Sequence, residues 1–393
     1  MGIESVHSDS RRVIFSSFLS FILNSTVRFF IPVLLPFLII SLRIDLYLGS
    51  LLITAYWIGY TFFQIPSGII GDRFGTAPVN KVFFILLALS FPFIYFLRDS
   101  YSGLFALQVI IGAISAVIYI TDASLVQKWS PMSGRAASVG LYQTGFFVGA
   151  SFGEFFVLEM FRFSFVLPFQ VILAFLAAVA ILNLFYIREP KESLKKTKGK
   201  ISRDLIYVCF IRFSAGFSYI GYLSLFTTFI VFDHIIAYSG AYSLAWIPAS
   251  GGLIGSPIGG YLSAKHSRGK SIVSIFSAAL IGLSLILLPY VQVFYVLIIS
   301  SLTGFFYGLY AGPSMSMASD FSGGDQNVSS SSGIINFSSQ IGGAISPVIV
   351  GYLFRIFGNF DWAFIIMGTV TLLTLVPPAM KFLVLHRNVK LSM

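Results

Sequence analysis

The chain of 393 residues is 56% hydrophobic and 10% charged, and its mean hydropathy is +0.88. Soluble domains carry about 25% charged residues, so this composition excludes a water-soluble fold. The net charge of +10 would suit a nucleic-acid partner, but the basic residues lie between apolar runs and no aromatic-basic binding motif accompanies them. We therefore predict a lipid bilayer around the chain and no nucleic acid.

Apolar runs long enough to cross a bilayer, about 20 residues each, recur along the chain. Backbone that faces lipid has to be helical or closed into a barrel. We predict an all-α integral membrane fold of twelve transmembrane helices in two pseudo-symmetric six-helix bundles. The first six runs lie at 13–42, 46–70, 82–97, 101–126, 136–158 and 163–187, and the second six at 205–232, 235–264, 271–288, 291–318, 329–354 and 362–385.

The start of the chain and its single cysteine add two expectations. The polar segment through Arg11 and Arg12 leads into an apolar run far longer than a signal-peptide core, so we expect an uncleaved first span. Cys209 lies in an apolar run and has no second cysteine to pair with, which rules out an internal disulfide bond. Its simplest interpretation is a small packing residue.

The longest hydrophilic stretch divides the chain near its middle. Residues 188–204 (REPKESLKKTKGKISRD) follow the sixth run and are rich in lysine and arginine. We predict an N-terminal half at 1–187, a basic cytoplasmic linker at 188–204 and a C-terminal half at 205–393. A weak echo of GIIGDRFG (68–75) in GYLSAKHSRGK (260–270) favours duplication of one half.

Lysine and arginine are distributed unequally between alternate loops. The loops on one side hold only Arg43, Arg98, Arg162 and Arg355, and nearly all the other basic residues lie on the opposite side. By the positive-inside rule the basic side is cytoplasmic. We predict a multi-pass protein of the cell (plasma) membrane with both termini in the cytoplasm.

The segment QIPSGIIGDRFG (64–75) resembles the loop between helices two and three of the major facilitator superfamily. The family pattern Gly-x-x-x-Asp-Arg-x-Gly is matched by Gly68, Asp72, Arg73 and Gly75. Two basic residues usually follow, whereas this chain has Thr76 and Ala77. The resemblance implies the major facilitator fold and a functional monomer that moves a small solute by alternating access.

The same segment predicts an inner gate. Gly68 would allow close helix approach and Gly75 a tight turn. Asp72 would face the N-terminus of span eleven, near SSSS (329–332), where free N–H groups carry partial positive charge; an ordinary solvated loop pair of Asp72 and Arg73 is the alternative. Asp122, near the inner end of span four, would pair with Arg73 or with a further gating residue, Arg135.

Two glycine-rich helices resemble other parts of the superfamily. GFFVGASFGE (145–154) is similar to the antiporter helix, although the expected proline is absent. Gly145, Gly149 and Gly153 recur every four residues and predict one face that packs closely on a neighbour. Residues 332–353 resemble the corresponding helix of the organic-anion symporters.

Four charged residues fall inside the predicted spans: Arg28, Asp122, Glu154 and Arg212. A charge at the bilayer centre costs at least about 2.5 kcal/mol, so each needs a partner or a function. Arg28 and Glu154 would form a static ion pair, or Glu154 would bind the coupling proton. Arg212 would contact the solute, or extend its guanidinium to the interface past lipid.

Arg28 and Arg212, on spans one and seven, are predicted to bind the anionic group of the solute. The family resemblance places these spans opposite each other across the cavity. With Asp122 in the gate, the interior keeps an excess positive charge that an anionic solute would neutralise. Near mid-depth we expect polar contacts to the solute from Asn24, Asn336 and Gln340 and an aromatic wall from Trp246. Hydrogen bonds between helices are the alternative role for the three polar residues.

The sequence contains no serine–histidine–acid set, Walker loop or metal cluster, so neither an enzyme, a cofactor nor a metal site is predicted. We predict a secondary transporter for a small organic anion, coupled to a proton or counter-solute gradient. The alternative is a multidrug-type efflux pump for amphipathic compounds. That alternative would favour an acidic, aromatic cavity, which the two arginines do not provide.

Overall fold

The computed structural model describes residues 3–130, 135–189, 200–233, 244–264, 268–321 and 328–385. Contacts divide the chain into two compact units, and each is described by itself. The first comprises Met1–Ile44, Leu51–Lys195 and Ala237–Trp246, and the second Asp45–Ser50, Lys196–Ile236 and Ile247–Met393. The division after Lys195 falls inside the predicted linker. Residues 190–199 of that linker lie outside the described ranges, so the domain boundaries stay a prediction.

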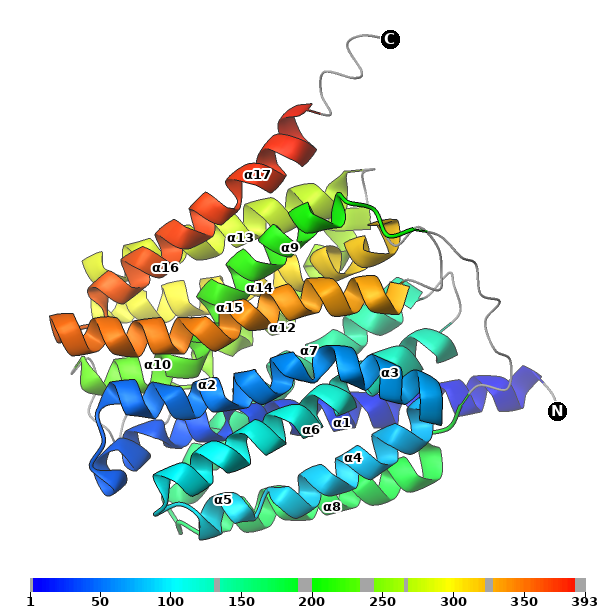
Figure 1. Cartoon of the computed structure of the whole chain (residues 1–393), viewed down its shortest axis with the longest axis horizontal. Helices are drawn as coiled ribbons and strands as arrows, with labels where there is room; N and C mark the ends of the chain where they lie inside the picture. Colours follow the sequence, from blue (N-terminus) through cyan, green and yellow to red (C-terminus); the bar gives the residue numbers. More distant parts are fainter. Residues whose placement is uncertain are drawn as a thin grey trace. The chain divides into compact units, whose positions relative to one another are not determined.

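The first unit is built from helices (Figure 1). Its second helix begins in the second unit and continues into the first. The helices are α1 (Ile3–Leu42), α2 (Leu46–Phe62), α3 (Gln64–Phe74), α4 (Thr76–Ser90), α5 (Phe93–Phe96), α6 (Tyr101–Trp129), α7 (Arg135–Phe161) and α8 (Leu167–Tyr186).

The second unit begins with one long helix that contains a π-helical turn. This helix consists of α9 (Leu205–Ala215), the π-helical turn η1 (Gly216–Ile220) and α10 (Gly221–Phe232). The remaining elements are α12 (Ile247–Ala264), α13 (Gly269–Leu287), η2 (Leu288–Tyr290), α14 (Val293–Phe321), α15 (Val328–Phe357), α16 (Asp361–Thr374), α17 (Val376–Ala379) and η4 (Met380–Leu385).

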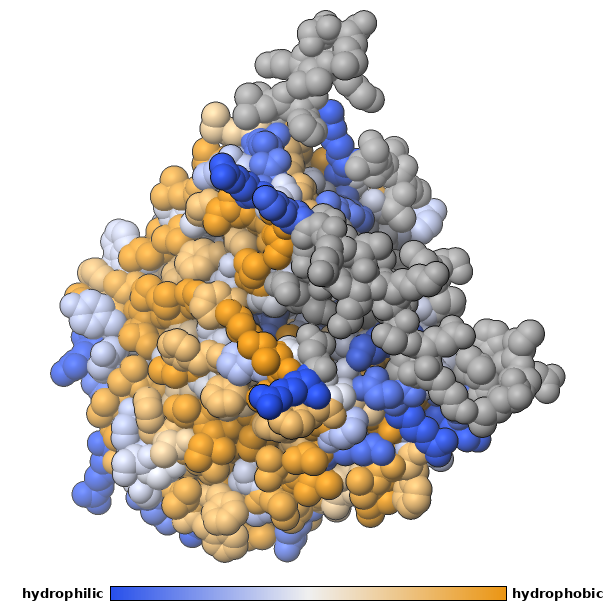
Figure 2. Space-filling view, turned by 45° about the vertical axis from the view of Figure 1, so that its right-hand side comes forward, coloured by the Kyte–Doolittle hydropathy of each residue, from blue (hydrophilic) through white to orange (hydrophobic). Residues whose placement is uncertain are grey.

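Eleven helical segments in the described ranges are long and apolar enough to cross a membrane. The eighth run, predicted at 235–264, is described only from residue 244 onwards and contributes α12. Large apolar side chains point outwards; Phe163 is 82% exposed and Phe96 is 72% exposed. Figure 2 shows one face on which apolar residues cover most of the surface that is not grey. Such a surface is suited to lipid rather than to water.

Glycine allows α7 to lie directly against α1. A methyl group at Gly149 would overlap the carbonyl oxygen of Ile22, and one at Gly153 would overlap the side chain of Thr26. The Thr26 hydroxyl donates a hydrogen bond across the contact to the Gly149 carbonyl oxygen at 3.2 Å. The close packing predicted from the glycine spacing in 145–153 is therefore present, and it fixes the middle of α1.

A second kind of close glycine contact occurs in both units. In the first unit, α2 and α6 meet where a β-carbon at Gly112 would overlap the backbone of Tyr56. In the second, α12 and α14 meet where a β-carbon at Gly251 would overlap the backbone of Ser301. The second and fourth predicted spans of each half thus both pack closely through glycine, in keeping with the duplication that the sequence echo indicates.

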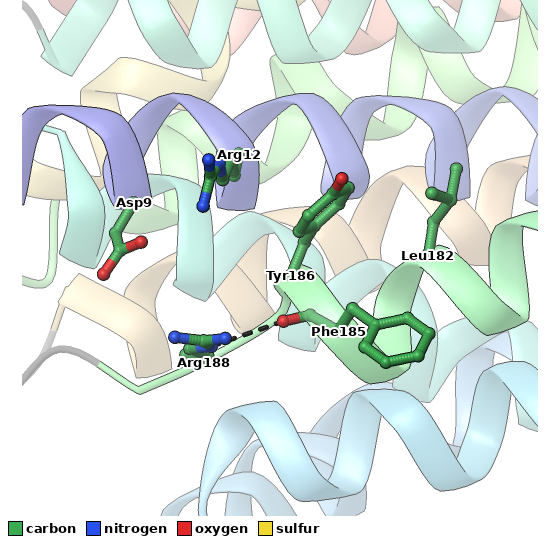
Figure 3. A pocket seen from close by; sticks show the side chains of 6 residues that line it. All are labelled: Asp9, Arg12, Leu182, Phe185, Tyr186 and Arg188. Carbon is green, nitrogen blue, oxygen red and sulfur yellow. Dashed lines mark hydrogen bonds between the residues drawn. The ribbon is translucent and has the colours of Figure 1, made fainter. Parts of the chain in front are cut away.

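A pocket of about 300 Å³ opens between the start of α1 and the end of α8 (Figure 3). Both helices belong to the first unit. Two of its lining residues, Arg12 and Arg188, are basic, and Asp9 is acidic. The pocket therefore combines charged groups with the apolar side chains of α8.

Candidate functional site

Arg28 lies in the middle of α1 inside a cage of aromatic rings. Its side chain is buried, with 6% exposed. The guanidinium carbon lies 4.6 Å from the ring centroid of Tyr60 and 5.4 Å from that of Trp57. Tyr56 and Phe146 complete the cage at 5.9 and 5.6 Å. The positive charge is thus surrounded by π-faces.

The hydrogen bonds of Arg28 are few for a buried guanidinium. Nε donates to the Tyr56 hydroxyl at 3.2 Å, whereas Nη2 has no hydrogen-bond partner among the described residues. No ion pair of Arg28 occurs within that part of the chain. Each cation–π contact is worth about 0.5–2 kcal/mol, so four rings offset an insertion cost of about 2.5–3.5 kcal/mol. The charge is stabilised without being neutralised.

Residue spacing and two close glycine contacts explain how the cage is positioned. Tyr56 and Tyr60 are four residues apart on α2, and a helix places such residues on one face. The contact of Gly112 with the α2 backbone fixes the depth of both rings. The packing of Gly149 on α1 fixes the helix that carries Arg28. Two glycine contacts therefore position the cation against its rings.

Arg212, on α9 of the second unit, is held by oxygen atoms as well as by a ring. It too is 6% exposed. Nη2 donates to Asn336 Oδ1 at 2.9 Å and Nη1 to Ser314 Oγ at 3.1 Å. The Tyr310 ring centroid lies 5.4 Å from the guanidinium carbon, and Gln340 donates to the same Asn336 oxygen at 3.3 Å. The structure brings together three residues predicted separately, and Arg212 does not extend past lipid.

A π-helical turn begins four residues after Arg212. Gly216 starts this turn, and a β-carbon there would overlap the Ser339 carbonyl oxygen on α15. The Tyr310 hydroxyl donates to the Arg212 carbonyl oxygen at 3.4 Å. Single π-turns within α-helices occur frequently at functional sites. This irregularity therefore marks the Arg212 region independently of its charge.

Two other predicted cavity residues have different surroundings. Asn24 is fully buried and its amide donates to the Ser115 carbonyl oxygen at 3.1 Å. That bond joins α1 to α6, which is the structural role weighed against solute contact. Trp246 precedes α12 and is 37% exposed. Contact of either residue with a solute stays a prediction.

Asp122 on α6 is completely buried. Its Oδ1 accepts a hydrogen bond from the Asn80 amide on α4 at 2.9 Å. Arg73, one of the two partners predicted for it, is exposed and lies with its guanidinium carbon 5.4 Å from the Phe74 ring centroid. No ion pair joins Arg73 and Asp122 in the described part of the chain.

The other predicted gating and coupling residues are only partly described. Gly75 has a φ of +90°, a region that favours glycine, as the expected turn requires. A β-carbon at Gly68 would have no described atom within 4 Å. The side chains of Asp72, Arg135 and Glu154 lie outside the described residues. The inner gate and the coupling role of Glu154 therefore stay predictions.

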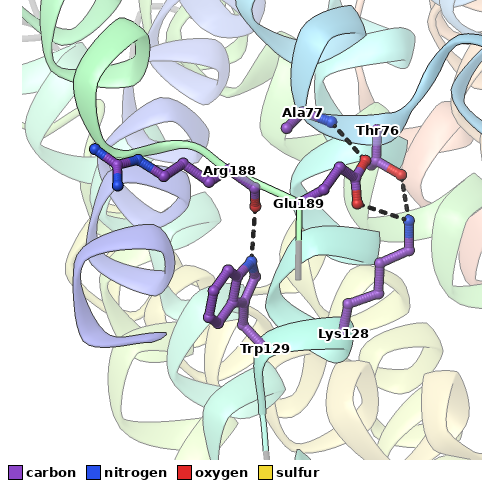
Figure 4. A network of polar contacts seen from close by, with 6 residues as sticks. All are labelled: Thr76, Ala77, Lys128, Trp129, Arg188 and Glu189. Atoms are coloured by element: carbon purple, nitrogen blue, oxygen red, sulfur yellow. Dashed lines mark hydrogen bonds and ion pairs between the residues drawn. The ribbon is translucent and has the colours of Figure 1, made fainter. Parts of the chain in front are cut away.

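A polar network holds the beginning of α4 (Figure 4). The Glu189 carboxylate accepts from the Ala77 N–H at 2.9 Å and lies 3.4 Å from Lys128 Nζ. Lys128 also donates to the Thr76 hydroxyl. A carboxylate at a helix N-terminus is favoured because the first N–H groups lack intrahelical acceptors. Glu189 thus caps α4 and links it to the end of α6.

The sequence profile of the Major Facilitator Superfamily matches residues 17–299 and 208–391. The chain belongs to the major facilitator superfamily. It is a multi-pass membrane protein of a family of transporters, and the predicted family and all-helical membrane fold are confirmed.

Three relatives of this major facilitator protein are transporters of named solutes. The hexuronate transporter of Bacillus subtilis (strain 168) is 22% identical over 391 residues, covering 92% of each chain. The probable galactarate/D-glucarate transporter of the same organism is 23% identical and covers 84% of this chain and 83% of its own. The D-galactonate transporter of Escherichia coli O6:H1 (strain CFT073) is 31% identical over 96 residues, 24% of this chain and 21% of its own.

Sequence reasoning missed the aromatic cage and the Glu189 network of this transporter. The spacing of Tyr56 and Tyr60 was a usable signal for the cage, since residues four apart share a helix face. The Glu189 network had a weaker signal. Thr76 and Ala77 stand where the superfamily usually has basic residues, and Lys128 on α6 brings a positive charge beside Thr76.

Proposed function

We propose that this major facilitator protein carries a small organic anion, in particular a sugar acid, by alternating access between its two halves. The observation that carries the proposal is Arg28, a buried guanidinium stabilised by rings. The solutes for which the relatives are named support a sugar acid, because hexuronate, galactarate, glucarate and galactonate are all carboxylates.

The chemistry of guanidinium favours this class of solute. Arginine stays charged at any relevant pH and presents a planar fork of donors that matches a carboxylate. In the cage, Arg28 Nη2 has a donor to offer. A carboxylate there would neutralise a charge that the rings only stabilise. The polyol part of a sugar acid would suit amide and hydroxyl groups such as those around Arg212.

Efflux of amphipathic cations is the alternative function. Aromatic rings in a binding site attract cations through their π-faces. Here the faces of Tyr60 and Trp57 are already occupied by the protein's own guanidinium. A cationic compound would meet the positive charge of Arg28 beside those rings, so the cage favours an anion.

Coupling to protons has two candidate carboxyl groups. Glu154 was predicted from its place in the glycine-rich helix α7. Asp122 is the buried acid in the described residues, with an Asn80 amide as its hydrogen-bond donor. If one of them binds the coupling proton, Glu154→Gln or Asp122→Asn abolishes uptake driven by a pH gradient and leaves counterflow exchange intact. If a variant retains uptake driven by a pH gradient, the substituted residue does not bind the coupling proton.

We also propose that the protein lies in the plasma membrane with both termini in the cytoplasm. The distribution of lysine and arginine supports it through the positive-inside rule. Cysteines introduced at Arg98 and Arg268 would be labelled by an impermeant thiol reagent from opposite sides. Labelling of the Arg268 position in intact cells would overturn this orientation.

The substrate proposal is tested by binding to the purified protein. Ligands that bind the native state raise the apparent melting temperature. We expect hexuronate, galactarate and galactonate to raise it and the corresponding neutral sugars to have no effect. Cationic dyes are included to test the alternative function, efflux of amphipathic cations.

Transport in proteoliposomes then separates binding from function. Counterflow of a radiolabelled sugar acid, driven by the unlabelled acid, is expected without any applied pH gradient. If only neutral or cationic compounds bind to the purified protein, the anion proposal fails and the efflux of amphipathic compounds becomes the favoured function.

A further inference from the structure

The pocket between α1 and α8 has no role in the proposed transport pathway. It is lined from α1 by Asp9 and Arg12, from α8 by Leu182, Phe185 and Tyr186, and beyond α8 by Arg188. In Figure 3, Arg12 and Arg188 lie near Asp9 at one side of the pocket, and Leu182 and Phe185 lie at the other. Its chemistry is therefore charged at one end and apolar at the other.

The position of the pocket along the helices matches this division. The apolar helix α8 ends at Tyr186, and the apolar run of α1 begins at Val13, directly after Arg12. The pocket residues thus lie beside the adjoining ends of these two apolar segments. At this level the hydrocarbon core gives way to lipid headgroups.

The charged end of the pocket retains a positive charge. Arg12 and Arg188 are exposed, and in the described part of the chain neither forms an ion pair with Asp9. The Arg12 guanidinium carbon lies 5.8 Å from the Tyr186 ring centroid, and Arg188 Nε donates to the Phe185 carbonyl oxygen at 3.3 Å. These contacts hold both cations near the pocket, and within the described residues they use one N–H donor of Arg188.

The apolar end continues along the surface of α8. Phe185 is 63% exposed, Ile181 is 55% exposed and Leu184 is 49% exposed. Residues three and four apart form a continuous stripe on one helix face. An acyl chain would lie along this stripe in direct continuation of the pocket.

We propose that this pocket binds an anionic phospholipid, with the phosphate between Arg12 and Arg188 and an acyl chain on the α8 stripe. Basic pockets between helices at the cytoplasmic membrane surface are typical sites for anionic headgroups. Free phosphate shares the charge but would leave the apolar end unused. The Asp9 carboxylate accepts hydrogen bonds, which favours a headgroup with hydroxyl donors such as phosphatidylglycerol.

Such a lipid would act on the segment that holds α4. The Arg188 carbonyl oxygen accepts from Trp129 Nε1 at 2.8 Å, and the following residue, Glu189, caps α4. Trp129 also packs against a buried apolar cluster of Val13, Ala77, Leu125 and Ile187. A lipid bound to Arg188 would therefore stabilise the same end of the first unit.

The test is lipid binding to the purified full-length protein, measured by native mass spectrometry and by melting temperature. Phosphatidylglycerol is expected to bind and to raise the melting temperature, whereas phosphatidylcholine and inorganic phosphate leave it unchanged. A basic residue near an anionic membrane surface contributes about 1 kcal/mol. Arg12→Gln and Arg188→Gln should therefore each weaken phosphatidylglycerol binding about 5-fold.

Arg162→Gln is the matched control. Arg162 is exposed and pairs with Glu159 at the end of α7, away from the pocket residues in sequence. It should bind phosphatidylglycerol like the parent protein. The proposal is overturned if the double variant Arg12→Gln/Arg188→Gln binds phosphatidylglycerol as tightly as the parent protein does. It is also overturned if the parent protein binds phosphatidylcholine as tightly as phosphatidylglycerol. The readout needs no transport substrate, so it is independent of the sugar-acid proposal.

Discussion

Arg28 and Arg212 are equally buried, yet the two units surround them with different chemistry. The guanidinium of Arg28 lies among the rings of Tyr56, Trp57, Tyr60 and Phe146 and donates to the Tyr56 hydroxyl. That of Arg212 donates to an amide oxygen and a hydroxyl and lies 5.4 Å from the Tyr310 ring centroid. Rings stabilise a cation through their quadrupole, whereas oxygen atoms occupy its N–H donors.

This difference predicts unequal contributions to anion binding. A carboxylate at Arg28 would gain hydrogen bonds without displacing strong acceptors. At Arg212 it would compete with the Asn336 and Ser314 oxygens. We expect Arg28 to supply more of the binding free energy of the proposed anion than Arg212.

Arg28→Lys should have the largest effect. Lysine keeps the charge and its contacts with the rings but loses the planar fork of donors. Loss of hydrogen bonds to a charged group costs about 1.5–3 kcal/mol, so the sugar-acid dissociation constant should rise up to about 100-fold. Isothermal titration calorimetry on the purified variant measures the change.

The variant has to remain folded for this comparison to hold. Its melting temperature without ligand should stay close to that of the parent, because the cation–π contacts persist. Unchanged affinity for the best anionic ligand in a folded Arg28→Lys protein would contradict the role assigned to the cage.

Gly149→Ala should act on stability. A β-carbon there overlaps the Ile22 carbonyl oxygen, so α7 has to move away from α1. Overpacking of this kind costs about 1–3 kcal/mol, which lowers the melting temperature and displaces Arg28 within its cage. Gly260→Ala is the control, because no described atom lies within 4 Å of its β-carbon. Similar melting temperatures for the two variants would contradict the tight α1–α7 contact.

Arg212→Lys should weaken anion binding less, by about 10-fold. Lysine would keep the charge, while the amide and hydroxyl oxygens continue to offer acceptors to it. The comparison with Arg28→Lys is made on the same ligand in the same assay. If Arg212→Lys costs more affinity than Arg28→Lys, the order of the two sites is reversed.

Tyr60→Leu should have the smallest effect on affinity, about 2- to 5-fold. It removes the closest ring of the cage, a contact worth about 0.5–1 kcal/mol. Tyr60→Phe keeps the ring and should bind like the parent. Equal loss in both variants would assign the effect to the Tyr60 hydroxyl instead of the ring.

The positions of the membrane helices could be predicted because lipid imposes one rule on all of them. Every span needs about 20 apolar residues, and its backbone groups have to be hydrogen-bonded within the helix. Such a run can be recognised in the sequence without knowledge of any tertiary contact. The glycine spacing in α7 likewise predicted close packing, since only the helix period is needed. Which helix received that packing, α1 in this case, depends on tertiary structure and could not be predicted.

The candidate site was predicted less completely. Arg28 and Arg212 were found because buried charge is costly and therefore conspicuous. Asn336 and Gln340 were found as isolated polar residues, but their convergence on Arg212 required the packing of α9 against α15. Residues of the cage come from α1, α2 and α7. The spacing of Tyr56 and Tyr60 places both rings on one face of α2, but that this face encloses Arg28 depends on tertiary packing.

The cage also contains a tryptophan whose fluorescence can report on binding in the first unit. The chain has four tryptophans, and Trp57 is the buried one, 1% exposed, with Arg28 5.4 Å from its ring. The emission of an indole depends on nearby charge, so a carboxylate arriving at Arg28 should change the fluorescence of Trp57. The natural protein therefore contains its own fluorescent reporter for an anion at Arg28, and Trp57→Phe is the control that lacks this signal.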